Sequence, residues 1–380
     1  MPRPARIGLL STFPPTQCGL ASFTAALLDE LAPGAGVVRV VERAEPVDDG
    51  RVVGELVAGS RSSARAAAEL LDRFDVAVVQ HEYGIYGGQD GLAVLDVVDL
   101  LAAPVVVVLH TVLRGPTARQ RHILERLLER ADLVVTMTRT ASERLVSTYA
   151  ADPARLAVIP HGAWRSGVPT AAPLPDPRLP GRRPLVLTWG LLGPGKGIEW
   201  AVDALPGLRD LDPRYLVSGQ THPKVLERDG EAYRDGLRRR IAARGVEDLV
   251  ELDERYLSTG ELARLVASAD VVLLPYDSEE QVTSGVLTEA VAAGRPVVST
   301  AFPHAVELLT GGPGLVVPRQ DPRAIELALR RVLTEPGLAA ALGASAADRA
   351  AELSWAAVAE RYQRAAGTLV AARARTEVGR

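Results

Sequence analysis

Residues 274–300 read LPYDSEEQVTSGVLTEAVAAGRPVVST, a stretch that joins two apolar runs through one short helix. The first run, 271–274, is too short for a helix of its own. The second run, 297–299, follows Gly294 and Pro296, which together end a helix. The pattern therefore predicts a strand, a loop, a helix and a second strand, in that order.

The amino end of this helix is predicted near Ser284 and Gly285. The Ser284 hydroxyl can cap free backbone amides, and Gly285 has no Cβ, so a ligand can approach the backbone there. The first turn is then suited to binding an anion. Glu289 lies about one turn further along, near enough to touch a ligand at the helix end. From its spacing alone, Glu289 fits an ordinary surface position equally well.

Composition favours a protein of two domains. The chain has 380 residues, whereas single cores stop growing at roughly 250 to 300 residues. Its apolar fraction of 47% can fill two cores. The net charge of -4, the pI near 6.0 and the scattered basic residues argue against any nucleic-acid partner.

Cys18 is the only cysteine, which excludes an intrachain disulfide and suggests a reducing compartment. The first residues lack the apolar core of a signal peptide, and no run of ~20 apolar residues exists to span a bilayer. We therefore expect a cytoplasmic protein without a transmembrane segment. Peripheral membrane association stays open, and the sequence does not indicate an oligomeric state.

Apolar strands alternate with helical patterns along both halves of the chain, which predicts an α/β fold with doubly wound parallel sheets. In the first half we expect strands at 7–10, 37–41, 76–79, 105–109, 133–135 and 157–159, and helices at 20–32, 60–73, 91–102, 117–131 and 139–149. In the second half we expect strands at 185–189, 214–218, 249–252, 271–274, 297–299 and 315–317, and helices at 196–205, 223–244, 259–268, 284–293 and 322–334.

Ligands of such sheets bind outside the carboxyl ends of the strands. In the first half these ends are followed by residues 13–19, 81–88, 110–111 and 161–162, which hold three of the six histidines. Each of these histidines fits a ligand role and a purely structural role equally well. The loop 81–91 has two tyrosines and four glycines, so it is either a sugar platform or a rigid turn packed on Phe74. Its candidate acceptor-binding residues are His81, Glu82, Tyr83 and Tyr86.

The second half opens with LVLTWGLLGPGKGIEW at 185–200, a strand, a glycine-rich turn and a helix start. Only Lys196 and Lys224 are lysines among the 43 basic side chains, so a lysine inside this turn suggests a specific role. A P-loop would need Ser or Thr where Gly197 stands, and a dinucleotide fingerprint would need glycine where Ile198 stands. The remaining interpretation is an anion site that faces the helix beginning at Ser284.

The glycine-rich turn with Lys196-Gly197, together with the motif E-A-x-A-x-G-x-P-V-V at 289–298, resembles the retaining GT-B glycosyltransferases of family 4, also called glycosyl transferases group 1. The match covers nearly the whole chain, including Cys18-Gly19, the segment 159–162 and the Ser-Trp start of the last helix. The resemblance implies two Rossmann-like domains facing across a cleft. Residues 1–165 would be the acceptor side, completed by a C-terminal helix at 354–380 that crosses back. Residues 166–183 would be the linker, and 184–353 the donor side.

The resemblance also implies roles for individual residues. Glu289 would bind the ribose of the nucleotide, Gly19 would lie against the diphosphate, and His110 would face the donor sugar. The diphosphate would be held by Lys196 and by the backbone of Gly190, Gly195, Ser284, Gly285 and Val286. The residues closest to the chemistry would be Lys196, His110 and Gln281.

The chain departs from the family at two positions. Gln281 stands where the family has glutamate, and Leu191 stands where it has arginine. Gln281 can hydrogen-bond a sugar hydroxyl but carries no charge and cannot attack carbon. The loss leaves Lys196 and the helix dipole as the main groups that neutralise the diphosphate, and Arg114 and Arg165 are candidates to compensate for it. Because of these two departures, the nucleotide sugar that this chain would use cannot be assigned directly from the family.

The implied activity is that of a hexosyltransferase, which moves mannose or glucose from GDP-mannose or UDP-glucose to a hydroxyl acceptor such as a growing glycan or small glycoside. The nucleoside diphosphate sugar would be a co-substrate, with no other cofactor and no metal. The only Asp-x-Asp sequence, at 210–212, precedes a strand and is interpreted as a solvated loop. The alternative is a nucleotide-sugar-binding protein with little turnover that acts as the partner of an active transferase.

Overall fold

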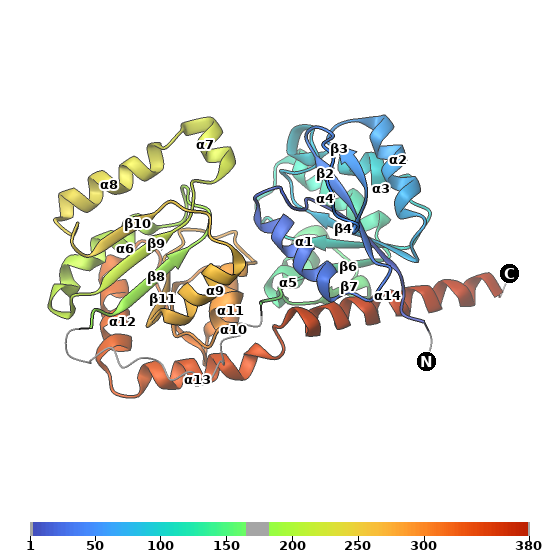
Figure 1. The fold of residues 1–380 in the computed structure, drawn as a ribbon. Coiled ribbons are helices and arrows are strands. Elements are labelled where there is room, and N and C mark those ends of the chain that lie inside the picture. Colours follow the sequence, from blue (N-terminus) through green and yellow to red (C-terminus); the bar gives the residue numbers. More distant parts are fainter. Residues whose placement is uncertain (1–2, 165–181, 379–380) are drawn as a thin grey trace. The chain divides into compact units, whose positions relative to one another are not determined.

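The computed structural model describes residues 3–164 and 182–378. The chain divides into two compact units (Figure 1). Unit 1 comprises Met1–Gly162 and Trp355–Arg380, and unit 2 comprises Ala163–Ser354. Of the predicted linker 166–183, residues 166–181 lie outside the described residues. No helix in the described ranges is both long enough and apolar enough to cross a membrane.

Unit 1 is built on a seven-stranded sheet in which every strand pair is parallel. The strand order is β3-β2-β1-β4-β5-β6-β7. The strands are β1 (Ile7–Ser11), β2 (Gly36–Val41), β3 (Val52–Val57), β4 (Val76–His81), β5 (Val105–Leu109), β6 (Leu133–Thr136) and β7 (Leu156–Val158). The helices are α1 (Gly19–Glu30), α2 (Arg61–Leu71), η1 (Gln89–Gly91), α3 (Val94–Val98), α4 (Ala118–Arg130), α5 (Arg139–Tyr149), η2 (Pro153–Arg155) and α14 (Trp355–Val378).

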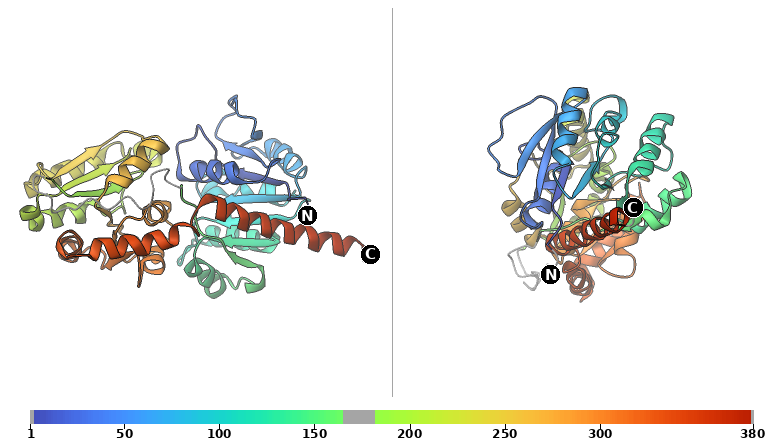
Figure 2. Two further views of the ribbon diagram at one scale, coloured as in Figure 1. Left: turned by 60° about the horizontal axis from the view of Figure 1, so that its bottom comes forward. Right: turned by 90° about the vertical axis from the view of Figure 1, so that its right-hand side faces the viewer.

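Helix α14 belongs to unit 1 although it is the last element of the chain (Figure 2). It packs against α1, and its buried side chains Trp355, Val358 and Tyr362 share one apolar core with Phe23 of α1. A Cβ atom at Gly162 would lie 2.2 Å from the Trp355 ring, so only glycine fits where the chain leaves unit 1. The predicted return of the C-terminal helix to the first domain is confirmed.

Unit 2 is built on a six-stranded parallel sheet in the order β10-β9-β8-β11-β12-β13. The strands are β8 (Leu185–Trp189), β9 (Arg214–Ser218), β10 (Val250–Asp253), β11 (Val271–Leu274), β12 (Val297–Thr300) and β13 (Gly314–Val317). The helices are α6 (Ile198–Ala204), η3 (Leu205–Leu211), α7 (Pro223–Asp229), α8 (Ala232–Arg244), α9 (Thr259–Ser268), α10 (Gly285–Ala292), α11 (Pro303–Leu309), α12 (Pro322–Thr334) and α13 (Leu338–Ala350).

The strand order reverses between β1 and β4 in unit 1 and between β8 and β11 in unit 2. The connections that follow two such neighbouring strands run to opposite faces of the sheet. This opens a crevice at the carboxyl edge of the sheet. In unit 2 the crevice is flanked by the glycine-rich turn after β8 and by the loop 275–284 after β11. The stretch 274–300 therefore contributes directly to the place where a ligand of this sheet would bind.

The predicted α/β class is confirmed, and five elements differ from the sequence prediction. Strand β3 and the helices α11 and α13 were not predicted. The helix predicted at 223–244 is two helices, because Gly230 ends α7 with φ at +59°. The helix predicted at 91–102 shortens to the five residues of α3.

Candidate functional site

The glycine-rich turn lies directly against the loop after β11. Gly190, Gly195 and Gly197 all have positive φ, at +115°, +87° and +64°. A Cβ at Gly197 would lie 1.9 Å from the carbonyl oxygen of Pro275, and the backbone amide of Asp277 donates to the Gly195 oxygen at 2.9 Å. The glycines are therefore needed both for backbone conformation and for close contact between the two loops.

Lys196, in this turn, places its ammonium group over the aromatic ring of Tyr276, which lies in the loop after β11. Its backbone amide donates to Gly193 at 3.2 Å, and its Nζ lies 4.4 Å from the centre of the Tyr276 ring, a cation–π distance. Tyr276 stacks in turn on Phe302 with ring centres 5.1 Å apart. Among the described residues no carboxylate forms an ion pair with Lys196. The ammonium group is thus positioned without being neutralised.

The amino end of α10 forms as predicted. Ser284 is the N-cap, and its Oγ accepts from the amide of Leu287 at 3.2 Å. No hydrogen bond within the described residues occupies the amides of Gly285 and Val286. A Cβ at Gly190 would lie 3.5 Å from a Val286 methyl, so the free amides border the glycine-rich turn. The two predicted halves of the anion site are therefore neighbours within unit 2.

One predicted donor is not available. The amide of Ser284 donates to Nδ1 of His304 at 2.8 Å, on the first turn of α11. Because this bond occupies the amide, the prediction that Ser284 contributes its N–H to a bound phosphate is wrong for this conformation. The imidazole of His304 instead fixes the cap residue of α10, and His304 is buried at 6% exposure.

Glu289 lies on the second turn of α10, half-buried beside the end of β8. Its Oε2 accepts a hydrogen bond from Nε1 of Trp189 at 3.4 Å. Burial raises the pKa of the Glu289 carboxyl to about 7, although the Trp189 bond acts in the opposite direction. The carboxyl is therefore divided between its charged and neutral forms near neutral pH.

Gln281 lies in the loop before α10, and its backbone is fixed at both ends. Its amide donates to the Ser278 hydroxyl at 3.1 Å, and its carbonyl accepts from the amide of His304 at 3.4 Å. Its side-chain amide has no hydrogen-bond partner within the described part of the chain. Arg114, which we considered as a replacement for the missing arginine, is an exposed residue of unit 1, and Arg165 lies outside the described residues.

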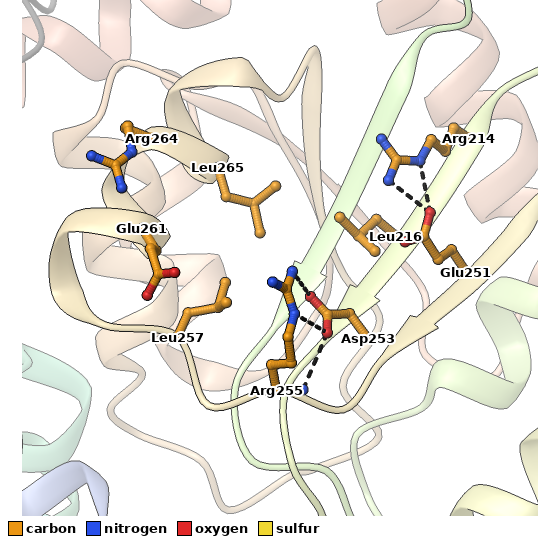
Figure 3. A pocket seen from close by; sticks show the side chains of 9 residues that line it. All are labelled: Arg214, Leu216, Glu251, Asp253, Arg255, Leu257, Glu261, Arg264 and Leu265. Atoms are coloured by element: carbon orange, nitrogen blue, oxygen red, sulfur yellow. Dashed lines mark hydrogen bonds and ion pairs between the residues drawn. The ribbon is translucent and has the colours of Figure 1, made fainter.

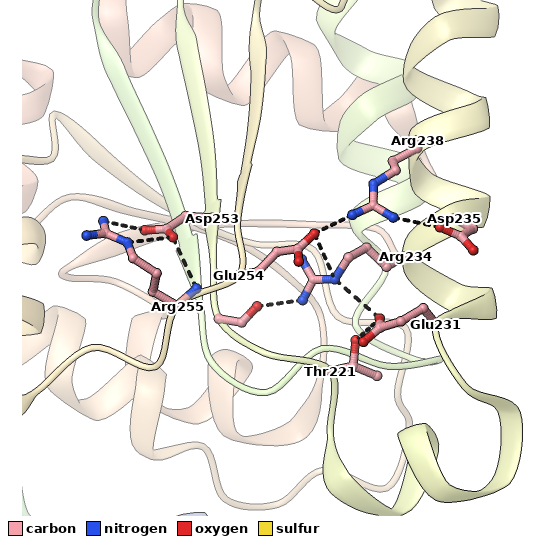
Figure 4. A network of polar contacts seen from close by, with 9 residues as sticks. Thr221, Glu231, Arg234, Asp235, Arg238, Asp253, Glu254 and Arg255 are labelled. Carbon is pink, nitrogen blue, oxygen red and sulfur yellow. Dashed lines mark hydrogen bonds and ion pairs between the residues drawn. The ribbon is translucent and has the colours of Figure 1, made fainter.

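The end of β9 supports the glycine-rich turn from behind through a buried arginine (Figure 4). Arg234 of α8 is 1% exposed, and its Nη2 donates to the carbonyl of Gly219 at 2.7 Å. Its Nε lies 3.5 Å from Glu231 and 3.8 Å from Glu254. A Cβ at Gly219 would lie 2.1 Å from the Gly190 oxygen, so this network holds the end of β9 against the turn.

In unit 1, His110 follows β5 at the carboxyl edge of the sheet. Its Nε2 lies 2.6 Å from Oε1 of Gln80, an acceptor, so Nε2 carries the proton and Nδ1 is an acceptor. The Phe23 ring meets it edge-on with centres 5.0 Å apart. Burial lowers the pKa of His110 to about 3, with a smaller effect from His161 and His81. Gly19, the first residue of α1, has open space where a Cβ would lie.

The predicted acceptor loop separates into buried and accessible residues. His81 and Tyr86 are both 0% exposed, and the Tyr86 hydroxyl donates to the carbonyl of Gln80 at 2.6 Å. Neither side chain can meet an acceptor in this conformation, so we correct their assignment to structural roles. Glu82 and Tyr83 stay half-buried, and Glu82 accepts from the Thr111 hydroxyl at 2.6 Å.

Two further polar features of unit 2 have their charges paired internally. The Asp-x-Asp sequence precedes β9, and its carboxylates pair with different arginines, Asp210 with Arg330 at 2.7 Å and Asp212 with Arg183 at 3.0 Å. Asp210 and Asp212 are exposed, as predicted, but Asp210 lies in the last turn of the helix η3 and Asp212 caps it, so the segment is not a loop throughout. A cavity of about 220 Å³ lies between α9 and the strands β9 and β10 (Figure 3). Two of its arginines are likewise bound to its own carboxylates.

The sequence interpretation missed Trp189 and His304. Trp189 ends the strand before Gly190, so the sequence already places it beside the glycine-rich turn. Its contact with Glu289 joins residues 100 positions apart, which no local pattern predicts. His304 directly follows Pro303, a residue typical of a first helical turn, so a helix start could have been found there. Its contact with Ser284 depends on how the two helices pack, which no local pattern shows.

Two family models match the chain. Residues 28–163 match "Glycosyltransferase Family 4", and residues 183–335 match "Glycosyl transferases group 1". The chain is similar to D-inositol 3-phosphate glycosyltransferase of Kineococcus radiotolerans, with 31% identity covering 62% of this chain and 57% of that protein. It is also similar to the enzyme of that name from Actinosynnema mirum, with 30% identity covering 86% and 80%. The chain thus spans little more than half of the first relative.

Solved structures resemble the chain over nearly its whole length. Anabaena HepE in complex with UDP and glucose has a TM-score of 0.75 at 14% identity, covering 96% of this chain and 100% of that one. Sucrose-phosphate synthase from Thermosynechococcus elongatus has a TM-score of 0.74 at 19% identity, covering 97% and 100%. At these identities the likeness shows the fold alone, which is that of two parallel α/β sheets.

Proposed function

Because the chain belongs to the family 4 glycosyltransferases, also called glycosyl transferases group 1, we propose that it transfers a hexose from a nucleoside diphosphate sugar to a hydroxyl acceptor. One observation carries the proposal. Unit 2 places the unneutralised Lys196 and the free amides of Gly285 and Val286 on adjacent loops at the crevice of its sheet. A diphosphate is the ligand that such a set of donors suits.

The proposed chemistry stabilises the leaving group. Negative charge grows on the diphosphate as the glycosidic bond breaks, and Lys196 with the α10 amides meets that charge from fixed positions. A phosphate oxygen then accepts the proton of the acceptor hydroxyl, which attacks from the side that the diphosphate leaves. This course retains the configuration of the sugar and requires no metal ion, because protein groups supply the compensating charge.

The other residues bind and orient the donor in this proposal. Glu289 accepts hydrogen bonds from the ribose hydroxyls, and Gln281 offers an unoccupied side-chain amide to the hexose. In unit 1, we propose His110 and Gly19 as donor contacts, with Glu82 and Tyr83 as acceptor contacts. Mannose and glucose are the proposed hexoses.

The names of similar proteins set the substrates to be tried first. Two relatives are named D-inositol 3-phosphate glycosyltransferases, and HepE was solved with UDP and glucose. We therefore include inositol 3-phosphate among the acceptors beside small glycosides, and UDP-glucose and GDP-mannose among the donors. The acceptor of this chain would be a small polyol or a glycan end.

The test is to incubate the purified full chain with each donor and acceptor, and to measure release of nucleoside diphosphate and the anomeric configuration of the product by NMR. Acceptor-dependent release with retention supports the proposal. The alternative is a nucleotide-sugar-binding protein, which the replacement of the family's glutamate by Gln281 favours. It would be supported if a donor stabilises the chain thermally but no acceptor brings about release of nucleoside diphosphate. Absence of both effects would refute both functions.

A further inference from the structure

Tyr276 is a buried aromatic side chain in the loop after β11, and three separate contacts hold it in place. It is 1% exposed, and its ring stacks on Phe302 with an interplanar angle of 27°. The Thr300 hydroxyl donates to the Tyr276 carbonyl at 2.6 Å. The amide of the next residue, Asp277, donates to the Gly195 carbonyl of the glycine-rich turn. The ring therefore has a fixed position relative to that turn.

The hydroxyl of Tyr276 does not account for the position of the ring. It is buried and makes no hydrogen bond within the described residues. A buried hydroxyl without a partner lowers the stability of the folded state, so this group adds nothing to the packing. The ring face, in contrast, has Nζ of Lys196 4.4 Å from its centre. The face is thus the part of Tyr276 that meets a charged group.

An aromatic face holds a cation without neutralising it. The π-electrons attract an ammonium group, but the ring has no net charge, so Lys196 keeps its positive charge for a ligand. A carboxylate in the same place would cancel that charge, and within the described ranges none pairs with Lys196. A long side chain that is already held also loses less conformational freedom on binding. The face of Tyr276 therefore suits a lysine that binds an anion.

We propose that Tyr276 is a positioning residue, whose ring face holds the ammonium group of Lys196 in place for the diphosphate. This inference rests on the proposed function and adds to it. The loop that carries Tyr276 leads directly into α10, where the amides of Gly285 and Val286 are free. The cation–π contact thus joins the cation of one loop to the loop that presents the amides, and both sets of phosphate donors are fixed before a ligand binds.

Two series of variants separate the ring face from packing. Tyr276→Phe keeps the face and removes the buried hydroxyl, whereas Tyr276→Leu removes the face. Phenylalanine with one, two or three ring fluorines at position 276 keeps nearly the same shape, while each fluorine draws electron density away from the face. Trp200→Leu is the matched control, because it removes from the same unit a ring that lies against another cation. The guanidinium carbon of Arg240 is 5.5 Å from the centre of that ring.

Calorimetric titration of the full chain with UDP and with GDP, beside uridine and guanosine, tests the proposal. For the nucleoside diphosphate that binds the unaltered chain, we expect Tyr276→Leu to weaken affinity about threefold to tenfold, the effect of losing one cation–π contact. Affinity should fall stepwise as fluorines are added. Tyr276→Phe and Trp200→Leu should stay close to the unaltered chain. Nucleoside affinity, measured by competition, should not change.

The same changes in a Lys196→Ala background form a double-mutant cycle. Without the ammonium group the ring face has no cation to hold, so neither Tyr276→Leu nor the added fluorines should weaken diphosphate affinity further. Thermal melting without ligand shows whether each variant is folded. If Tyr276→Leu does not fold, the fluorinated rings still test the inference, because they keep an aromatic ring in the core.

Equal diphosphate affinity across the fluorine series would overturn the inference and leave the proposed function standing. A loss of the same size with and without the lysine would also overturn it, since the ring would then shape the loop rather than hold the cation. Failure of the unaltered chain to bind either nucleoside diphosphate would overturn the proposed function as well.

Discussion

Replacement of Glu289 by glutamine should stabilise the protein at alkaline pH and have little effect at acidic pH. The unfolded chain releases this proton near the ordinary glutamate pKa of 4.5, whereas the folded chain holds it until about pH 7. Between these values the folded state binds more protons, so the stability contribution of Glu289 falls as the pH rises. Below pH 4.5 the unfavourable effect is absent, and above pH 7 it is complete.

The magnitude follows from the two pKa values. One pKa unit corresponds to about 1.36 kcal/mol, so burying the charged carboxylate costs about 3 kcal/mol at pH 8 and about 1 kcal/mol at pH 5. Glu289→Gln removes the ionisable proton and keeps an oxygen for the indole of Trp189. The variant should therefore exceed the unaltered chain in free energy of unfolding by about these amounts.

Urea unfolding at pH 5 and pH 8 measures this difference, with Glu247→Gln, an exposed glutamate of the same unit, as the control. The control keeps Glu289 and should therefore match the unaltered chain in free energy of unfolding at both pH values. If Glu289→Gln has the same effect at both pH values, burial does not raise the pKa of Glu289 and the reasoning is refuted. In the unaltered chain, donor affinity should rise between pH 6 and pH 8, because only the carboxylate accepts from both ribose hydroxyls, and this rise should vanish in the variant.

Lys196→Ala should lower turnover by roughly 10²- to 10³-fold, measured as release of nucleoside diphosphate. If Lys196→Ala also loses thermal stability without ligand to a degree that accounts for the lower turnover, the role of Lys196 is structural. Transfer should persist in excess chelator, and complete loss that magnesium or manganese restores would contradict the proposed charge compensation. Gln281→Glu should weaken donor affinity and preserve retention, since it adds a negative charge near the diphosphate. Adding Leu191→Arg should recover part of that loss. Strictly additive effects of the two substitutions would mean that positions 191 and 281 do not share the phosphate site. Gly197→Ala should destabilise the fold by about 1 to 3 kcal/mol through its positive φ and close contact, measured by urea unfolding. Gly260→Ala, with no atom within 4 Å of the new Cβ, should not.

Strands with continuous apolar runs were predictable because both faces of a parallel sheet are covered. The prediction succeeded for β5, where all five residues are buried. Strand β3 was missed because it pairs only with β2 at the edge of the sheet and is mostly half-buried, with Gly54 in its middle. Its sequence therefore lacks the apolar run on which the prediction depended.

The candidate site was predictable where a local pattern defines it and not where packing does. Ser284 as the cap of α10 follows from the sequence around it, and the structure confirms it. The bond from the Ser284 amide to His304 depends on two helices meeting, and it removed one predicted phosphate donor. Tyr86 shows the same limit, because a tyrosine in a glycine-rich loop has the same sequence pattern whether its ring faces solvent or the core.

The chain passes from unit 1 to unit 2 after Gly162 and returns to unit 1 after Ser354, and this order matters for synthesis on the ribosome. The backbone amide of Ala163, just after Gly162, donates to the Leu353 carbonyl at 2.7 Å, just before Trp355 begins α14. Unit 2 thus has all of its residues once position 354 has been made. Unit 1 begins first but needs Trp355, Val358 and Tyr362 for its core, so its core can be completed only after all of unit 2 has been made.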